Sequence, residues 1–499
     1  MPPANRPAPA VLRYASIAVA VVLLTTTLAS RISLVTTLLL NIMGEEQNVV
    51  YGVIKWMKDD VPLYSDPQVL PMDIIQYSPL YYYVTGSIGR LVGVDPMEPQ
   101  EVYVLIRTIG LIFNALFVFM AFNIARTLGA ARWSALLWCA VLFNFLPRQV
   151  YSRPDSLNLL LFASGTFLFL RWLRSRDGKN WSAQLLPITV IFCAAMCTKQ
   201  SGMLGLLIVG AYLLFTRDWR ALLQHVVVAG VVIGTVVALL CVQSGGTAVW
   251  HNLITSIRNA VNLDLVRSML TIRFLGFFTV QAIGLVLAWR WWRSGDAMRR
   301  GLALAFVASV CFGYSSGLKY GSSTAYCMEG LMLGSAMLAS LLGTTDGERP
   351  TAQRIALFGL ALLFIHPGQM AWGITVLRGR NTVKNEAVQY EEAKALAHEF
   401  RTDPELSDGL VFLRRHDHLE NFLVGRSVLT QRDIFLLETS QRHMDLSAFP
   451  EGLDAGTIRF VVSRDTITDL PLVSISHFEL RSLGTRHGYF VLENSAWHP

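Results

Sequence analysis

Residues 44–66 read GEEQNVVYGVIKWMKDDVPLYSD and begin only a few residues after a long apolar segment. An acidic pair, Glu45 and Glu46, therefore stands where the chain leaves a predicted membrane span. Acidic residues in the first turn of a helix interact favourably with the helix dipole, so an ordinary helix start is one interpretation. The other interpretation is that the pair is part of a functional site at the membrane boundary.

The composition is typical of a polytopic membrane protein. Of the 499 residues, 53% are hydrophobic and only 15% are charged, whereas soluble proteins hold about 25% charged residues. The mean hydropathy is +0.43. The net charge of +7 is uneven, because residues 378–499 hold 14 Lys and Arg against 18 Asp and Glu, and residues 1–377 hold 28 against 17. This contrast predicts a membrane domain over 1–377 and a soluble domain over 378–499. Because the basic residues lie in short loops between apolar segments, the pattern excludes a nucleic-acid binder.

Eleven apolar segments are long enough, or nearly so, to cross a bilayer. They lie near 12–34, 102–125, 133–147, 156–172, 184–198, 202–215, 222–242, 274–290, 302–314, 329–343 and 355–376. Arg and Lys in alternate loops predict a cytoplasmic N-terminus. An odd number of spans then places the tail outside, on the same side as the long loops 35–101 and 243–273. The predicted fold is a mainly α, polytopic membrane protein of about 11 transmembrane helices with a small extracytoplasmic α/β C-terminal domain.

The polar tail has both helical and strand-like patterns. The segment NEAVQYEEAKALAHEF predicts a helix near its start. Short runs rich in β-branched and aromatic residues follow: GLVFLRR, IRFVVSRD, FELRSLGT and GYFVLEN. Arg486–His487–Gly488 separates the last two runs and predicts a hairpin turn.

The loop after the acidic pair continues as PLYSDPQVLPMDIIQYSPLYYYV, residues 62–84. Its four prolines exclude long helices, and its tyrosines make it aromatic and amphipathic. Such a loop is suited to form one wall of a groove at the membrane interface. This loop contains Tyr64, Tyr77, Pro79 and Tyr81.

Two further groups of charged residues lie at the same predicted face. The string PRQVYSRPDSLNLL brings Arg148, Arg153 and Asp155 to the start of a span, where Asp155 as a helix cap paired with Arg153 is the plainer interpretation. Lys199 in CTKQSGM and Lys319 in GLKYGSSTAYCMEGLML form the other group, together with Tyr320, Tyr326 and Glu329. A lysine between apolar segments often only extends its amine to the interface. Two lysines and two arginines at one face also suit a lipid-linked phosphate.

Taken together, these strings resemble the GT-C glycosyltransferases, in the bacterial branch near the protein mannosyltransferase-like and aminoarabinose transferase-like families. The resemblance covers about residues 40–330. It rests on the acidic pair, Pro62–Leu63–Tyr64, Tyr77–Ser78–Pro79–Leu80, Arg153–Pro154–Asp155, Lys199–Gln200–Ser201–Gly202 and the stretch from Lys319 to Glu329. The sequence departs from the family where the pair is Glu-Glu instead of an Asp-containing pair, and where Asp59–Asp60 replaces a frequent Gly.

The resemblance implies an enzyme of the bacterial cytoplasmic (inner) membrane that moves a sugar from a polyprenyl-phosphate donor to an extracytoplasmic acceptor. A glycan or lipid acceptor is favoured over a protein. Glu46, or else Glu45, would act as general base in an inverting transfer, and Asp155 would orient the acceptor, assist the base or ligate a divalent cation such as Mg or Mn. The positive charges of Arg148, Arg153, Lys199 and Lys319 would offset the charge of the leaving phosphate, with Tyr320 and Glu329 binding substrate. The groove for the prenyl chain and the sugar would be lined by Tyr64, Tyr77, Pro79 and Tyr81.

Three other classes of protein compete with this interpretation. A transporter predicts charges or broken helices at mid-bilayer and often two related halves, and no internal repeat is present. A lipid-linked polysaccharide polymerase or ligase usually carries its large loop later in the chain. A membrane scaffold without enzymatic activity would make the acidic residues dispensable.

Overall fold

The computed structural model describes residues 10–38, 46–58, 61–147, 150–175, 181–258, 260–269, 275–342, 380–414, 418–430, 434–435, 441, 443–465, 470 and 478–498. The chain divides into two compact units. One, called the helical unit, is drawn from Met1–Val35, Thr108–Thr235 and Val261–Arg378; the other, called the sheet unit, is drawn from Thr36–Arg107, Val236–Ala260 and Gly379–Pro499. The long loop after the first span therefore groups with the tail. The predicted domain boundary at 377–378 lies outside the described residues and remains a prediction.

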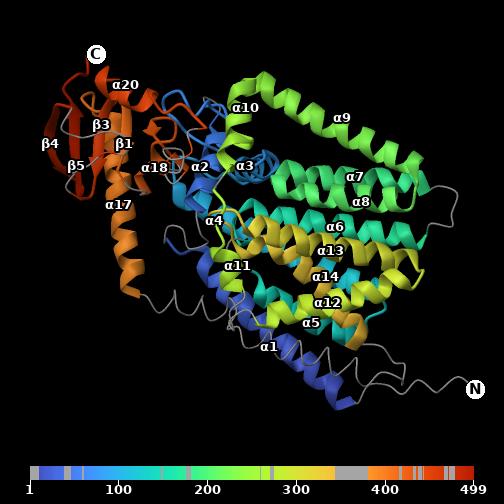
Figure 1. Ribbon diagram of the computed structural model, residues 1–499. Helices are drawn as coiled ribbons and strands as arrows, with labels where there is room; N and C mark the ends of the chain where they lie inside the picture. The colour runs from blue at the N-terminus through green and yellow to red at the C-terminus, as the bar shows by residue number, and fades with distance from the viewer. Residues whose placement is uncertain are drawn as a thin grey trace, which may run out of the picture. The chain divides into compact units, whose positions relative to one another are not determined.

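The helical unit is built from apolar helices. They are α1 (Ala10–Val35), α5 (Arg132–Phe145), α6 (Pro154–Arg174), α7 (Trp181–Thr198), α8 (Met203–Phe215), α11 (Asp264–Met269), α12 (Leu275–Arg293), α13 (Ala297–Gly317), α14 (Met328–Leu342) and the larger parts of α4 (Pro99–Thr127) and α9 (Trp219–Ser244). Helices α6, α7, α8 and α13 lie side by side with their axes roughly aligned (Figure 1).

Helix α14 is the centre of the helical unit. Every residue from Met328 to Leu342 is buried, and the helix packs against α5, α6, α12 and α13. A Cβ on Gly334 would lie 3.1 Å from side-chain atoms of both Phe306 and Val280. Glycines four residues apart, here Gly330 and Gly334, let apolar helices approach closely.

Among the described residues, five helices are long and apolar enough to cross a membrane: Ala10–Val35, Pro99–Thr127, Pro154–Arg174, Trp219–Ser244 and Thr324–Leu342. They support a multi-pass membrane protein. Ten of the eleven predicted segments overlap a helix, and the eleventh, 355–376, lies outside the described residues. The number eleven is not confirmed, because helices such as α5 and α8, with 14 and 13 residues, are shorter than the roughly 20 residues that a span needs.

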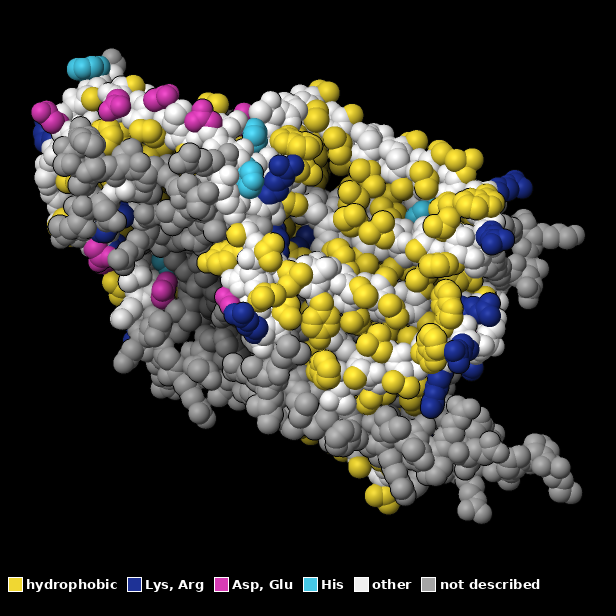
Figure 2. All heavy atoms as spheres, in the orientation of Figure 1, with side chains coloured by type: hydrophobic (Ala, Val, Ile, Leu, Met, Phe, Trp, Pro, Cys, Tyr) yellow, Lys and Arg dark blue, Asp and Glu magenta, His cyan; other side chains and the backbone are white. Residues whose placement is uncertain are grey.

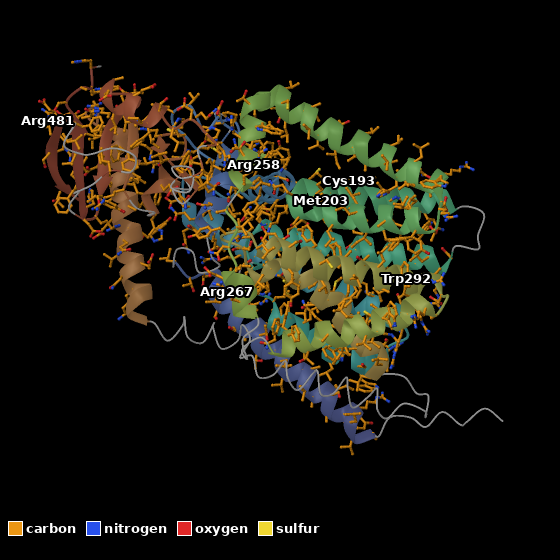
Figure 3. The ribbon with its side chains drawn as sticks, viewed as in Figure 1. Cys193, Met203, Arg258, Arg267, Trp292 and Arg481 are labelled. Carbon is orange, nitrogen blue, oxygen red and sulfur yellow. The ribbon has the colours of Figure 1, made fainter. Side chains whose placement is uncertain are left out.

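The surface of the helical unit fits a lipid environment. Figure 2 shows hydrophobic side chains over its helices and Lys and Arg gathered at one end. Basic residues stand in the last turns of α6 and α12. Trp292 lies at this end of α12 (Figure 3), where its ring packs edge-on against Phe215 of α8 at a centroid distance of 5.7 Å. Aromatic rings and basic side chains are typical of a membrane–water interface. The orientation of the chain in the membrane remains a prediction.

The sheet unit contains a five-stranded mixed sheet of order β2-β1-β3-β5-β4. Its strands are β1 (Leu410–Leu413), β2 (Ser427–Val428), β3 (Ile458–Ser463), β4 (Leu480–Arg486) and β5 (Tyr489–Asn494). Its helices are α2 (Glu46–Met57), α3 (Leu80–Val92), α10 (Gly246–Leu253), α17 (Arg380–Thr402), α18 (His418–Phe422) and α20 (Ala448–Asp454). The predicted tail helix and four predicted strands are confirmed; the two-residue strand β2 had no recognisable pattern.

The hairpin between β4 and β5 forms where the sequence predicts it. Arg486 pairs with Tyr489 in an antiparallel register. The two residues between them, His487 and Gly488, have φ angles of 48° and 77°. Positive φ at both central positions defines the two-residue turn that matches the twist of antiparallel strands, and glycine adopts it without a steric cost.

Alternate residues of β1 face two different hydrophobic cores, as the two-residue period of a strand requires. Val411 and Leu413 pack with the apolar side of α17. Phe412 packs on the other face with Met72 and Ile74 of the first loop. The loop of residues 61–79 is therefore part of the core of the sheet unit, and no helix occurs within it.

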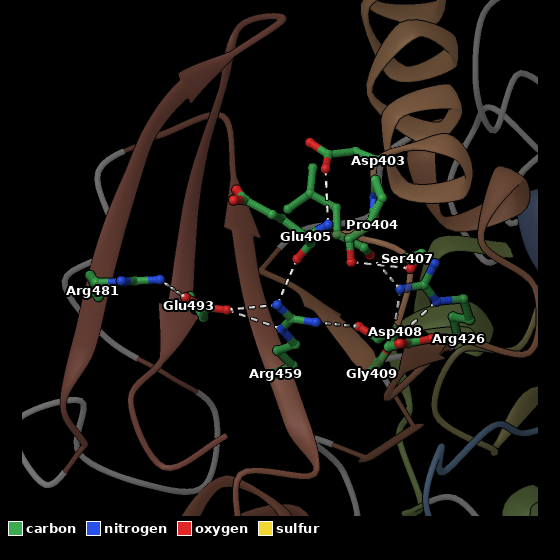
Figure 4. Close-up of polar contacts among 11 residues, drawn as sticks. Asp403, Pro404, Glu405, Ser407, Asp408, Gly409, Arg426, Arg459, Arg481 and Glu493 are labelled. Carbon is green, nitrogen blue, oxygen red and sulfur yellow. Dashed lines mark hydrogen bonds and ion pairs between the residues drawn. The ribbon is translucent and has the colours of Figure 1, made fainter. Parts of the chain in front are cut away.

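Arg426 joins the end of α17 to the strands (Figure 4). Its guanidinium donates to the carbonyl oxygens of Phe400 at 2.7 Å, Leu406 at 3.0 Å and Gly409 at 3.0 and 3.1 Å. The planar fork of arginine fits several acceptors that a lysine amine cannot reach together. This residue therefore fixes the connection into β1.

We expect Arg426→Lys to destabilise the protein by about 1.5–3 kcal/mol, the usual effect of losing hydrogen bonds from a charged group. The midpoint of thermal unfolding in detergent measures the change. Arg481→Ala is the matched control, because Arg481 is 69% exposed and pairs with Glu493 at the surface, where an ion pair contributes about 0–1 kcal/mol. Equal losses for both variants would contradict the role of Arg426.

Candidate active site

The helical unit buries an ion pair at the start of α6. Asp155 lies in the first turn, directly after Pro154, whose fixed φ suits that position. Lys199 lies between α7 and the short 3₁₀ helix η2 (Gln200–Gly202). Its Nζ donates to Asp155 Oδ1 at 2.6 Å, and both side chains are about 95% buried. Two charges taken out of water are stable only when they pair so closely.

Three further side chains, Arg153, Asn158 and Glu329, lie beside this pair. Together with Asp155 and Lys199 they form what we call the acid–lysine cluster. Arg153 Nε lies 3.6 Å from Asp155 Oδ2, so the predicted pairing of these two residues is present. One turn along α6, Asn158 Nδ2 donates to Glu329 Oε1 at 3.4 Å. The N-cap residue of α6 is Arg153, and Asp155 lies inside the first turn of the helix. Within the described parts of the chain, Asp155 Oδ2 and Glu329 Oε2 accept no hydrogen bond.

Lys319 follows α13 and is held by backbone pairing. Val261 and Lys319 form an isolated antiparallel bridge, and the Asn262 amide donates to the Leu318 carbonyl at 2.6 Å. Burial, followed by the positive charge of Lys199, lowers the pKa of Lys319 from 10.5 to about 8. The adjacent Tyr320 is 47% exposed. Lys199 also lies 4.4 Å from the ring centroid of Tyr326.

Arg31 of α1 is a residue that the sequence reasoning missed. It is buried, and its Nη2 donates to the Phe143 carbonyl at 3.1 Å. Its guanidinium lies 3.7 Å from the ring centroid of Tyr151, in the string that leads to Arg153 and Asp155. Arg31 therefore packs against the segment that leads to Arg153 and Asp155. The sequence could have pointed to Arg31, because it is a single arginine near the end of an apolar segment. A charge in such a segment costs free energy and usually has a function.

In the sheet unit, Glu46 forms a buried, bidentate ion pair with Arg107. Arg107 Nε donates to Glu46 Oε1 and Arg107 Nη2 donates to Oε2, each at 2.7 Å. Both side chains are at most 1% exposed. The guanidinium also donates to the Thr37 carbonyl. Both carboxylate oxygens of Glu46 are thus occupied by one cation.

Helix α2, which Glu46 begins, is buried on nearly all sides. Lys55 on the same helix is fully buried and donates to Asp73 Oδ2 at 2.6 Å. The Tyr51 hydroxyl donates to the same oxygen at 3.3 Å. Burial, followed by the Asp73 charge, raises the pKa of Tyr51 well above its ordinary value. These bonds tie α2 to the first loop.

The tyrosines and proline predicted to line a groove all lie in the sheet unit. Tyr64 is buried and donates to the Tyr77 carbonyl at 2.8 Å, while the Tyr77 side chain is partly exposed. Pro79 is buried directly before α3. Tyr81 is fully buried and packs edge-on against Tyr82, with 6.2 Å between ring centroids. The buried side chains of Tyr64 and Tyr81 have packing partners here, and a groove-lining role remains a prediction.

Two predicted site residues, Glu45 and Arg148, lie outside the described residues. The other predicted residues form two sets: Asp155, Arg153, Lys199, Lys319, Tyr320 and Glu329 in the helical unit, and Glu46, Tyr64, Tyr77, Pro79 and Tyr81 in the sheet unit. Among the described residues, no three His, Cys, Asp or Glu side chains group in a way that could hold a metal ion.

Comparison with solved structures shows that the chain has the GT-C fold, as its sequence predicts. ArnT from Cupriavidus metallidurans in the apo state matches with a TM-score of 0.56 and 16% identity, over 95% of this chain and 98% of that chain. The same protein bound to undecaprenyl phosphate matches with a TM-score of 0.54 and 16% identity, over 96% and 99%.

A second similar fold is that of the Archaeoglobus fulgidus oligosaccharyltransferase in complex with Zn and sulfate. The TM-score is 0.57 and the identity 12%, over 89% of this chain and 67% of that chain. No family model matches the chain, and no curated protein matches it in sequence. At these identities the likeness establishes the fold.

Proposed function

We propose that this protein is a membrane glycosyltransferase that moves a sugar from a polyprenyl-phosphate donor to an extracytoplasmic acceptor, with a glycan or lipid favoured over a protein. The observation that carries the proposal is the acid–lysine cluster. Among the described residues, Asp155 Oδ2 and Glu329 Oε2 are buried and accept no hydrogen bond, and the same unit contains two lysines, Lys199 and Lys319. Sugar hydroxyls supply donors and a phosphate supplies the anion, so a glycosyl phosphate satisfies both requirements.

The fold supports the same class of donor. One matching structure of ArnT contains undecaprenyl phosphate. A matching structure of the archaeal oligosaccharyltransferase AglB contains a dolichol-phosphate together with an inhibitory peptide. Both carriers are polyprenyl phosphates, which agrees with the donor that we propose here.

The lysines are proposed to hold the phosphate. Lys199 is fixed by Asp155, and the lowered pKa of Lys319 reflects in part its repulsion from Lys199. An anion bound by both would remove that repulsion. As the sugar leaves, the electron pair of the C1–O bond passes to the phosphate oxygen, and the lysines and Arg153 stabilise the resulting charge. Arg148, Tyr320 and Glu329 remain proposed donor or acceptor contacts.

The acceptor hydroxyl must lose a proton when it attacks the sugar, and this requires a general base. Its hydroxyl oxygen forms the new bond to C1 and gives its proton to a carboxylate, which implies inversion at C1. We assign this role to Glu45 instead of Glu46, because Arg107 occupies both oxygens of Glu46. Asp155, also held by a cation, is proposed to orient a substrate hydroxyl.

No reaction step is assigned to a metal, because the described residues contain no fitting group of ligands. Dependence on Mg²⁺ or Mn²⁺ remains a prediction from the resemblance. Turnover measured with EDTA and after addition of each cation tests it.

The test of the function is sugar release from a panel of synthetic polyprenyl-phosphate sugars by the purified protein, with the binding of each donor measured alongside. Turnover of one donor, or tight binding of one donor when the acceptor is absent from the assay, supports the proposal. Binding of none of them would overturn it and favour a transporter or scaffold. Release only in the presence of a growing glycan chain would favour the polymerase or ligase.

We expect donor affinity to depend on pH through Lys319. Below pH 8 the amine is already protonated, so the Kd of a phosphodiester donor stays constant. Above pH 8 binding must take up a proton, and the Kd rises by up to about tenfold per pH unit. Lys319→Arg keeps the charge at all these pH values and should remove the dependence. The same slope in that variant would contradict the assignment.

A further inference from the structure

Helix α18 (His418–Phe422) connects the tail to the first loop. All five of its residues are buried, and it packs on α2 and α17. A helix this short has little stability of its own, so its buried polar side chains depend on partners elsewhere. His418 Nε2 bonds Glu386 of α17 at 3.0 Å, which anchors α18 to the helix that covers the sheet.

Glu420 and Asn421 of α18 reach the surroundings of Glu46 through separate contacts. Glu420 Oε2 accepts from Gln47 Nε2 at 2.8 Å, and Gln47 directly follows Glu46. Asn421 Nδ2 donates to the Tyr103 hydroxyl at 3.2 Å. The Tyr103 ring centroid lies 5.1 Å from the guanidinium carbon of Arg107, which pairs with Glu46.

We infer that α18 of the C-terminal tail is the positioning element for the start of α2, with Glu420 and Asn421 as positioning residues for Glu46, which directly follows the proposed base Glu45 in the sequence. The start of α2 is held through Gln47, and the cation that binds Glu46 is held through Tyr103. The catalytic part of this inference rests on the proposed function. It gives the tail a role in transfer, because a small displacement of a reacting group can cost about 10²-fold in rate.

The test exchanges the hydrogen-bond partners. Gln47→Glu places a second carboxylate against Glu420 and should lower kcat for sugar transfer by about 10- to 100-fold, with the Kd of the donor within about twofold of the original. The double variant Gln47→Glu with Glu420→Gln restores one donor and one acceptor in exchanged positions. We expect it to recover kcat to within about threefold.

A second readout does not require turnover. Hydrogen–deuterium exchange over residues 46–57 should become faster in Gln47→Glu and return to the original rate in the double variant. Glu399→Gln is the matched control, because Glu399 pairs with Arg486 and His487 at the other end of α17. It lies 13 residues from Glu386, roughly 20 Å along the helix. It should change neither kcat nor this exchange.

Each outcome decides the inference. Unchanged kcat in Gln47→Glu, or a loss that the double variant does not recover, would overturn the positioning role. Faster exchange of α2 with unchanged kcat would also overturn it, since α18 would then hold the helix without serving the acids. If the original protein turns over no donor and binds none, the proposed function fails, and the exchange measurement still shows whether α18 holds α2.

Discussion

Glu45→Gln is expected to lower kcat for sugar transfer by about 10²- to 10⁴-fold, the usual contribution of a general base. The acceptor hydroxyl would have no carboxylate to take its proton, whereas the amide of Gln keeps the size of the side chain. Donor affinity should stay the same, because the proposed phosphate contacts come from Lys199 and Lys319. Single-turnover assays with a bound donor measure the transfer step directly.

Asp66→Asn is the control for this substitution. Asp66 is an acid of the same loop, is half-buried and accepts a turn hydrogen bond from the Gln68 amide at 3.1 Å. It should retain kcat. If Glu45→Gln keeps full turnover while Glu46→Gln abolishes it in a still-folded protein, the base is Glu46, and the ion pair with Arg107 must then open during the reaction.

Glu46→Ala is expected to destabilise the protein by about 3–5 kcal/mol, the usual cost of removing one partner of a buried ion pair. The buried Arg107 guanidinium would lose both of its hydrogen bonds to the Glu46 carboxylate. Arg107→Met should have an effect of similar size, because it leaves the Glu46 carboxylate buried instead. Thermal unfolding in detergent, followed for each variant, measures the loss.

The double variant Glu46→Leu with Arg107→Met distinguishes this explanation from a simple loss of packing. It removes both charges and keeps apolar side chains of similar volume, so the unfolding midpoint should recover most of the loss of either single variant. Additive losses would show that the two residues act independently. Lys55 and Asp73 form a second buried pair in the same unit, and both residues stay intact in all these variants.

Much of the candidate site could be predicted because short strings carry it. Arg153 and Asp155 are two residues apart, so their pairing follows from local geometry alone. The pairing of Asp155 with Lys199 spans 44 residues and needs the packing of α6 against α7. No local pattern encodes such a contact. The same reason explains why Arg31, far from Tyr151 in the chain, was missed.

The sequence also could not separate the two members of the acidic pair. Glu45 and Glu46 are adjacent and chemically identical, and either suits a general base. Arg107, which occupies Glu46, lies 61 residues further along in an apolar segment. Its pairing depends on how the first loop folds back onto the start of α4, which is a property of tertiary packing.

The sequence by itself determined that this is a multi-pass helical membrane protein with a small α/β tail, where four strands of the tail lie, and that acids and cations recur at segment ends. These features follow from hydropathy and from periods of 3.6 and 2 residues, which act over a few neighbours. Only the tertiary structure decided which charges pair, that the first loop shares a core with the tail, and that α18 contacts the start of α2. Those contacts join residues far apart in the chain, such as Gln47 and Glu420, which are 373 positions apart. Burial and charge balance act over such separations, and local pattern does not.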